Sequence, residues 1–286
     1  MSTHADSLAR RVLREGKTKA GALVVLALIV FAVLGPIVSS HDPFASDFAR
    51  GISTEQTPLG PSALHWLGTD RIYRDELVRL ALGGRLSLGI GLGATAVATV
   101  IGALVGMIAG FFEGSAADVV LMRIVDVSLA FPFLLLVMTL GVVFDRTTPL
   151  TILLTLGLTG WLGTARIVRA KTIGIRSLDF VQAARALGQS TPRLIWLHVV
   201  PNVSPLLLVL ATMSVAQMII AESVLSYLGA GISPPAPTWG HMLFEGQDYY
   251  QAAPWILLAP AVTILASVLG FNLLGEGLRD AIEPKR

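Results

Sequence analysis

The chain has 286 residues, of which 53% are hydrophobic and only 14% are charged, and its mean hydropathy is +0.71. Soluble domains carry about 25% charged residues, so this composition indicates an integral membrane protein. The net charge is only +2, and no segment gathers a contiguous basic face, which argues against a nucleic-acid partner. The absence of cysteine excludes disulfides, thiolate zinc sites and cysteine nucleophiles.

Charge-free windows predict the transmembrane helices, because a spanning helix needs about 17–25 mainly apolar residues. Six windows qualify: Lys19–Asp42, Arg85–Glu113, Asp126–Asp145, Arg146–Arg166, Arg193–Glu222 and Asp248–Glu276. The third and fourth are predicted to form an antiparallel hairpin around Asp145–Pro149. The expected fold class is therefore an all-α integral membrane protein with six transmembrane helices.

A seventh charge-free window, Ser223–Phe244, is rejected as a span because it contains three glycines and three prolines. Such breakers leave backbone groups unpaired, which lipid does not tolerate. We expect an ordered loop at the membrane surface, either lying on it or re-entrant.

Lysine and arginine set the expected orientation, because cytoplasmic loops carry an excess of them. With six spans, fifteen of these residues fall on the side of the two termini and six on the other, so both termini are expected in the cytoplasm. The predicted organisation is a cytoplasmic N-terminal segment at 1–20, a retained first transmembrane helix at 21–40, an extracytoplasmic loop with an interfacial helix at 41–85, and a transmembrane core at 86–286 with a cytoplasmic loop at 170–200.

The cytoplasmic loop contains the stretch "DFVQAARALGQSTPRLIWLHVVPN", which reads as two short helices. Ser177 is a candidate N-cap for the first helix, and Gly188 fits a left-handed C-cap. Thr191 and Pro192 suggest the start of the second helix, which Pro201 is expected to break or kink.

The first of these helices carries an apolar stripe. Phe180, Ala183, Ala184 and Leu187 recur at the spacing of one helix face. Two interpretations stay open: the stripe packs on the protein's own helix ends, or it docks into a groove on a soluble partner.

Several motifs in consecutive order carry a family resemblance. "QAARALG" followed by "HVVPN" resembles the EAA loop of ABC importer permeases. "HWLGTDRIYRDELVRLALGGRLSL", "RIVDVSLAFPFLLL", "LTGWLGTARIVRA", "SVLSYLGAGISPPAPTWGHML" and "FNLLGEGLRDAIEPK" resemble segments of the dipeptide/oligopeptide/nickel subfamily, and the span ending "SSHDPF" resembles its C-type subunit. The resemblance covers residues 17–286 and implies the type I ABC importer permease fold.

The resemblance also implies partners and roles. It implies a homologous B-type permease subunit in a heterodimer, two cytoplasmic ATPase subunits that bind ATP and magnesium, an extracytoplasmic substrate-binding protein, and the lipid of a prokaryotic inner membrane. Peptides are the implied substrate, with nickel or another non-peptide solute as the alternative. The residues implied to couple to the ATPase are Phe180, Gln182, Ala183, Ala184, Arg185, Leu187, Gly188 and Arg193.

Two positions depart from the family's pattern. Gln182 stands where the first residue of the EAA motif is usually glutamate, which affects the charge-dependent part of docking. Tyr73 stands where the family commonly has glycine, so a flexible turn becomes bulkier.

Further polar and aromatic residues are candidates for the pathway and for the outer surface. Glu222 is costly within a membrane helix and is predicted to face the pathway or a polar partner, with Gln217 and Ser214 as further candidates for the pathway or a gate on the same helix; an interfacial cap is the alternative. The candidates for contact with a binding protein are His65, Trp66, Asp70, Arg71, Arg74 and Trp239. The histidines are far apart in sequence without evident carboxylate companions, so no metal site is predicted.

Other functional classes find less support. The chain contains no phosphate-binding G-x-x-x-x-G-K-[ST] motif, so ATP hydrolysis is expected on another subunit and the chain is not expected to be an enzyme. A stand-alone secondary transporter would need inverted repeats and more intramembrane charge, and an intramembrane hydrolase would need a nucleophile–base pair. "GIGLGA" lies inside the second span, where glycines at four-residue spacing, including Gly102, Gly106 and Gly110, predict helix packing rather than a dinucleotide site.

Asp126 is expected to pair with Arg123.

Overall fold

The computed structural model of the chain describes residues 12, 14–39, 41–143 and 148–282, and it is built from helices. In chain order these are α2 (Gly16–Val38), α3 (Glu76–Phe111), α4 (Ala116–Leu129), α5 (Phe133–Val143), α6 (Pro149–Thr159), α7 (Leu162–Arg176), α8 (Asp179–Ala186), α9 (Thr191–Leu194), a π-helical turn (Ile195–Val199), α10 (Val200–Tyr227), α11 (Trp239–Gly246), a 3₁₀ turn (Gln247–Tyr249) and α12 (Pro254–Ile282).

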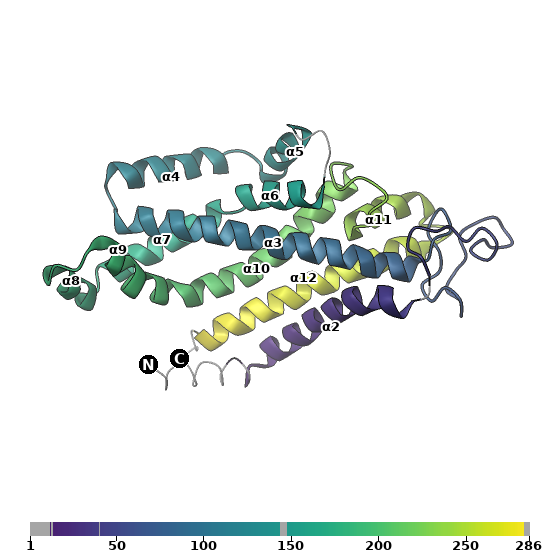
Figure 1. Cartoon of the computed structure of the whole chain (residues 1–286), viewed down its shortest axis with the longest axis horizontal. Coiled ribbons are helices and arrows are strands. Elements are labelled where there is room, and N and C mark those ends of the chain that lie inside the picture. The colour runs from purple at the N-terminus through teal and green to yellow at the C-terminus, as the bar shows by residue number, and fades with distance from the viewer. Residues whose placement is uncertain (1–11, 13, 40, 144–147, 283–286) are drawn as a thin grey trace.

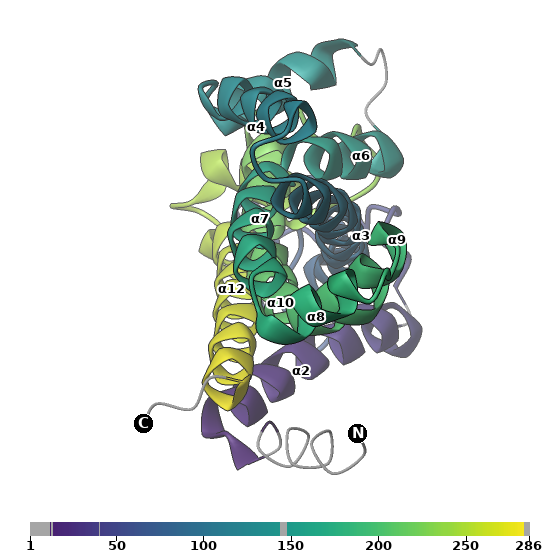
Figure 2. The same cartoon turned by 90° about the vertical axis from the view of Figure 1, so that its left-hand side faces the viewer.

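The long helices run along the long axis of the molecule and separate two ends (Figure 1). One end carries α8 and α9 beside the start of α2 and the end of α12, and we name it the α8 end. The other carries α11 and the loop 41–75, and we name it the α11 end. Figure 2, which looks at the α8 end, shows α4 and α5 on the side of the bundle opposite α2.

Five helical stretches are long and apolar enough to cross a membrane: Gly16–Val38, Glu76–Phe111, Pro149–Arg176, Thr191–Tyr227 and Pro254–Ile282. A sixth span is counted when α4 and α5 are taken together, although they meet at a 90° bend. The prediction of six spans is thus confirmed in this form, but the third is not the straight helix expected from its window. Pro132 lies at the bend, where it lacks an N–H and disfavours helical geometry in the residue before it.

Two predicted boundaries differ from the structure, and a third cannot be compared with it. The fourth span runs on to Arg176, beyond the expected end at Arg166. No separate interfacial helix precedes the second span, because residues 76–85 are the first turns of α3, which Asp75 caps by accepting a hydrogen bond from the Val78 N–H at 2.9 Å. Most of the predicted hairpin turn at 145–149 lies outside the described residues.

Helix α3 lies at the centre of the bundle and packs against α2, α6, α7 and α10. Gly102, Gly106 and Gly110 face α7: a Cβ on Gly106 would lie 2.6 Å from the carbonyl oxygen of Ala165, and one on Gly110 would lie 2.6 Å from that of Arg169. Such close backbone approach requires small residues. The helix-packing interpretation of the glycine pattern is confirmed, and "GIGLGA" lies within this continuous helix.

The window 223–244 does not cross the membrane as a helix, as predicted. Its first residues extend α10 to Tyr227, a turn follows, and α11 then packs against α10, α12 and α3. The glycines and prolines thus allow the chain to fold back onto its own bundle.

Candidate functional site

The segment between α7 and α10 forms two short helices, as predicted, but Ser177 does not cap the first of them. Ser177 has helical backbone angles at the end of α7, and its hydroxyl donates to the carbonyl of Gly174 at 2.9 Å. Leu178 occupies the N-cap position of α8 without a side-chain cap. The serine therefore completes the preceding helix.

Gly188 ends α8 in the left-handed conformation, with φ of +83°, which confirms the predicted C-cap. The N–H of Gln189 donates to the carbonyl of Ala184 at 3.2 Å, and the N–H of Gly188 donates to Arg185 at 3.0 Å. These two bonds form a Schellman motif. The next helix begins with Ser190, not Thr191, at the N-cap position.

Pro201 does not break the helix that enters the membrane, which was expected to end or kink there. The helix is continuous from Thr191 to Tyr227. A π-helical turn at Ile195–Val199 directly precedes the proline, and the N–H of Val200 donates to the carbonyl of Ile195. This wider turn accommodates a ring that would otherwise clash with the carbonyl four residues earlier.

Helix α8 turns most of its predicted apolar stripe outward. Val181, which was not assigned to the stripe, is buried, and Ala184 packs against the same internal cluster. Phe180 is 48% exposed and Leu187 is 89% exposed. Together with the exposed Ala183, these two residues form what we call the α8 face.

Polar contacts hold this segment in place. The Gln182 side-chain amide donates to the carbonyl of Arg176 at 2.8 Å, so this residue closes the end of α7. His198 Nε2 lies 3.1 Å from Gln189 Oε1, and its ring lies 5.7 Å from that of Phe180. Among the described residues Arg185 and Arg193 form no ion pair, and both side chains are exposed.

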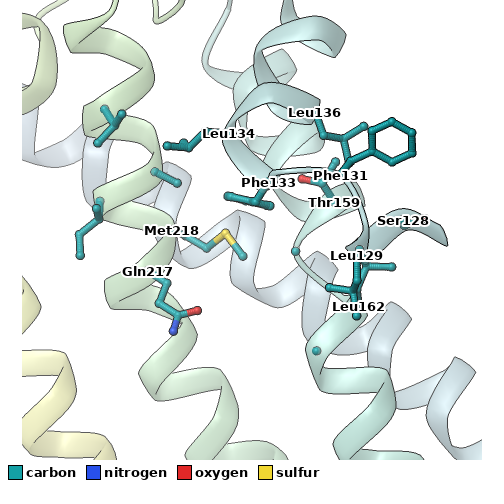
Figure 3. A pocket seen from close by; sticks show the side chains of 15 residues that line it. Ser128, Leu129, Phe131, Phe133, Leu134, Leu136, Thr159, Leu162, Gln217 and Met218 are labelled. Carbon is teal, nitrogen blue, oxygen red and sulfur yellow. The ribbon is translucent and has the colours of Figure 1, made fainter. Parts of the chain in front are cut away.

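A largely apolar pocket of about 420 Å³ opens where the α4–α5 bend faces the α6–α7 joint and α10. Figure 3 shows Met218 projecting from α10 toward Phe133 and Thr159, with Gln217 below it. Gln217 is exposed and lines the pocket, as its predicted pathway role requires, whereas Ser214 is not among the lining residues.

Glu222 faces away from this pocket. It is fully buried, and its two carboxylate oxygens accept hydrogen bonds from Ser87 at 2.9 Å and Ser226 at 2.8 Å. Ser87 in turn accepts from the backbone N–H of Trp239 at 3.2 Å. In this conformation Glu222 joins α3, α10 and α11, which is the polar-partner alternative, and it does not line the pocket.

Four of the six candidates for contact with a binding protein lie inside the protein. His65, Asp70, Arg74 and Trp239 are buried, and the Trp239 indole N–H donates to the carbonyl of Leu80 at 3.0 Å. Trp66 is 67% exposed and Arg71 is partly exposed, so only these two candidates present a surface. Sequence alone did not reveal that the other four hold the α11 end together.

A buried charge network at the α11 end explains their positions. Glu245 on α11 pairs with Arg71 at 3.2 Å, Arg74 at 3.3 Å and Arg79 at 3.0 Å. Asp70 bonds to Arg74 at 2.6 Å and lies 3.1 Å from Arg79 Nε, without hydrogen-bond alignment in the second case. Burial raises the pKa of Glu245, but the charges of Arg79 and Arg74 outweigh it, so this pKa lies below its usual value of 4.5.

Two further ion pairs fasten α4 to α7. Arg169 binds Asp118 through two hydrogen bonds, at 2.6 and 2.7 Å. Asp126 pairs with Arg166 at 2.5 Å. The expected pair between Asp126 and Arg123 is not formed among the described residues. These pairs give Arg166 and Arg169 acidic partners, so the fourth span can continue through both residues past its predicted end.

The turn at Tyr73 has a backbone that favours glycine. Tyr73 has φ of +66°, a left-handed conformation that is uncommon for a side chain with a Cβ. This explains why glycine suits the position, and Tyr73 partly compensates through an edge contact with Phe48, with ring centroids 5.6 Å apart.

Comparison with known proteins places this geometry in a family. Residues 102–286 match the binding-protein-dependent transport system inner membrane component family. The chain is 40% identical over 278 residues to the oligopeptide transport system permease protein OppC of Escherichia coli K12, covering 97% of this chain and 90% of that protein. It is 38% identical over 277 residues to the dipeptide transport system permease protein DppC of Bacillus subtilis, with coverage of 96% and 84%.

Among solved structures, the inward-facing MetNI methionine ABC transporter matches with a TM-score of 0.55 at 17% identity, covering 72% of this chain and 96% of that one, which supports the fold. The expected fold class is thereby confirmed. The chain belongs to the family of multi-pass inner-membrane components of binding-protein-dependent transport systems.

Proposed function

We propose that this chain is one membrane subunit of an ATP-driven importer that carries peptides delivered by a binding protein. The observation that carries the proposal is 40% identity to an oligopeptide permease over 97% of the chain. Relatives named for dipeptides and for di- and tripeptides match at 38%. ATP and magnesium would be bound by two separate ATPase subunits.

In this proposal the α8 end faces the cytoplasm, as the excess of lysine and arginine at that side supports. The α8 face of Phe180, Ala183 and Leu187 contacts an ATPase subunit, and the exposed Arg185 and Arg193 offer charge to acidic groups on it. Three other residues give the segment its shape: Gln182 through its bond to α7, Ala184 through packing, and Gly188 through the C-cap. The outward orientation of the apolar stripe supports the docking interpretation.

The pocket beside Gln217 is proposed as this chain's share of the translocation path, with a homologous B-type subunit facing it and lipid around the remaining helices. Its opening at the α4–α5 bend supports this role, because a bent pair leaves a gap that a straight helix would fill. At the opposite end, Trp66 and Arg71 are proposed as surface for the binding protein.

Reconstitution in vesicles tests the proposal. The chain is combined with its B-type partner, the ATPase subunits and the binding protein, and uptake of a labelled oligopeptide is measured with and without ATP. We expect ATP-dependent peptide uptake that requires the binding protein. Uptake of Ni²⁺ but not peptide would favour the solute alternative, and uptake driven by an ion gradient without ATP would favour a secondary transporter.

A pair of variants tests the docking face. The double change Phe180→Ala and Leu187→Ala should abolish retention of the ATPase on the purified membrane subunits. Leu23→Ala with Leu26→Ala is the control, since both leucines are also exposed but lie on α2. Equal retention of the ATPase by both double variants would refute docking through the α8 face.

A further inference from the structure

Two histidines that are distant in sequence meet at the α11 end. The rings of His41 and His65 lie 4.8 Å apart. His65 has a carboxylate companion after all, because its Nδ1 lies 2.8 Å from Asp75 Oδ2. The expectation that His65 lacks a carboxylate companion was therefore wrong, since the loop 41–75 folds back onto the start of α3.

His65 is held rigidly with one nitrogen left over. Its side chain is 1% exposed. Asp75 accepts from Nδ1 with one oxygen, and its other oxygen accepts from the N–H of Val78, so the carboxylate is fixed. The remaining nitrogen, Nε2, is buried and has no hydrogen-bond partner in the described part of the chain. It lies 3.9 Å from Asp47 Oδ2.

A small cavity of about 280 Å³ adjoins these groups. It is lined by His41, Asp42, Ala45, Ser46, Asp47, His65 and Asp75. The lining therefore offers two imidazoles and three carboxylates, of which Asp75 is buried, Asp47 is 21% exposed and Asp42 is exposed. Arg50 pairs with Asp47 at 3.3 Å. Imidazole and carboxylate are groups that bind zinc in proteins.

We propose that His41, His65 and Asp75 bind a divalent transition-metal cation of the Zn²⁺ class, in place of the hydrogen bond between His65 Nδ1 and Asp75 Oδ2. One ligand atom from each of the three residues lies within 4.8 Å of the others, and His41 Nδ1 lies 3.7 Å from Asp75 Oδ2. Two ligands of a tetrahedral Zn²⁺ lie about 3.4 Å apart, so the longest separation would shorten by roughly 1 Å on binding. Asp47, 3.9 Å from the opposite ring nitrogen Nε2, would orient the His65 ring rather than bind the ion. A set that combines imidazole with carboxylate suits Zn²⁺, Ni²⁺ or Fe²⁺ better than Mg²⁺ or Ca²⁺, which prefer oxygen ligands alone.

The bound cation would fasten three segments to one point. His41 follows the end of α2, His65 lies in the middle of the loop, and Asp75 caps α3. Without the ion, the His65–Asp75 hydrogen bond and packing hold the first part of the loop, while the Glu245 network holds its last residues, Asp70 to Arg74. The site is thus structural: it sets the shape of the surface that carries Trp66.

Zinc binding by the full-length chain tests the proposal. The protein is purified in detergent with a tag that lacks histidine and is titrated with ZnCl₂ by calorimetry, and thermal unfolding is followed in parallel. We expect about one Zn²⁺ per chain and a higher melting temperature with zinc, because a ligand that binds only the folded state stabilises it. Mg²⁺ and Ca²⁺ should give no shift.

The His41→Gln variant is decisive, because His41 is only half-buried and its replacement leaves the Asp75–His65 bond in place. It should bind zinc at least about tenfold more weakly and lose the zinc-dependent shift. His198→Gln, which removes a histidine at the α8 end, is the matched control and should bind as the wild type does. Equal zinc affinity in the wild type and His41→Gln, no zinc binding by the wild type, or an equal shift with Mg²⁺ would each overturn the proposal.

Discussion

Two helices of the same length, α8 and α11, stand at opposite ends of the molecule and are packed in opposite ways. Each has eight residues. In α8 only Val181 is buried, whereas α11 buries Trp239, Gly240, Met242, Glu245 and Gly246. The first leaves apolar side chains uncovered, and the second has its indole and carboxylate bonded to the bundle.

This difference shows two ways in which a short helix can be held in place. A helix of eight residues is too short to be stable by itself in water, so something else must hold it. For α11 this is the chain's own core and charge network. For α8 it is the Gly188 C-cap, the bond from Gln182 to α7 and one buried side chain, which leaves an exposed surface for another molecule to cover. The two helices therefore make opposite predictions for stability and coupling.

The largest effect is expected at Trp239. Trp239→Ala removes a fully buried ring and leaves the carbonyl of Leu80 without its donor. We expect a loss of about 3–5 kcal/mol in the free energy of unfolding, measured by thermal or denaturant unfolding in detergent. Trp196→Ala, at the α8 end, removes a side chain that is 71% exposed and should cost no more than about 0.5 kcal/mol in the isolated chain. Similar losses of unfolding free energy in Trp239→Ala and Trp196→Ala would contradict the difference in packing between the two ends.

Acidic residues on the two helices provide the next test. Glu245→Gln leaves Arg71, Arg74 and Arg79 around an uncharged side chain, and breaking such a buried network costs about 3–5 kcal/mol, less what the amide recovers by hydrogen bonding. Asp179→Asn on α8 changes an exposed acid and should be nearly neutral. Unfolding of both variants is measured as above, and an unchanged midpoint for Glu245→Gln would contradict the network.

Two glycines with nearly the same backbone conformation allow the two ends of the molecule to be compared at equal backbone strain. Gly188 ends α8 with φ of +83°, Gly229 follows α10 with φ of +80°, and an added Cβ at either meets nothing within 4 Å. Valine at either position should therefore cost a similar amount, about 1–2 kcal/mol, from backbone strain alone. Only Gly188→Val should uncouple ATP hydrolysis from transport. Substrate-stimulated ATPase activity in vesicles checks this, and normal stimulation in Gly188→Val would refute a coupling role for α8.

The smallest effect is a pH dependence confined to the α11 end. Burial lowers the pKa of His241 below its usual 6.5, and the charge of Glu245 only partly opposes this. The unfolded chain then binds more protons than the folded one, so the stability contribution is complete above pH 6.5 and is lost as the pH falls through the folded pKa. Between pH 7 and pH 5, the melting temperature of the His241→Asn variant should fall less steeply than that of the wild type. Parallel slopes would show that His241 does not titrate in this way.

Much of the fold follows from where charges are absent. Five of the six windows coincide with long helical spans because a span must be apolar throughout, although the fourth is built from α6 and α7. The α4–α5 bend was missed although Pro132 marks it, since a charge-free window reports composition and not direction. The Ser177 cap was misassigned because a serine between two helices can serve either one, and only the geometry of α7 decides.

The site was less accessible to sequence reasoning, for a geometric reason. Gln217 and Glu222 were grouped as one polar strip, yet five residues of α-helix turn by about 500°, which places them ~140° apart on α10. Gln217 reaches the pocket and Glu222 reaches α3. Likewise, nothing local to Arg79 indicates its partner Glu245, because Arg79 on α3 and Glu245 on α11 are 166 residues apart in the sequence.

The π-helical turn at Ile195–Val199 fixes the angular phase between two distant surfaces. A rigid rod of about 35 Å joins Leu194, beside α8, to Gln217 at the pocket. Because a π turn holds one residue more than an α turn over nearly the same rotation, winding the same residues as regular α-helix would rotate one surface by about 100° against the other, whereas deleting one residue there would leave the two surfaces nearly in phase. The turn thus works as an alignment joint, and a permease without it would need a different sequence register to point the same residues at the same places.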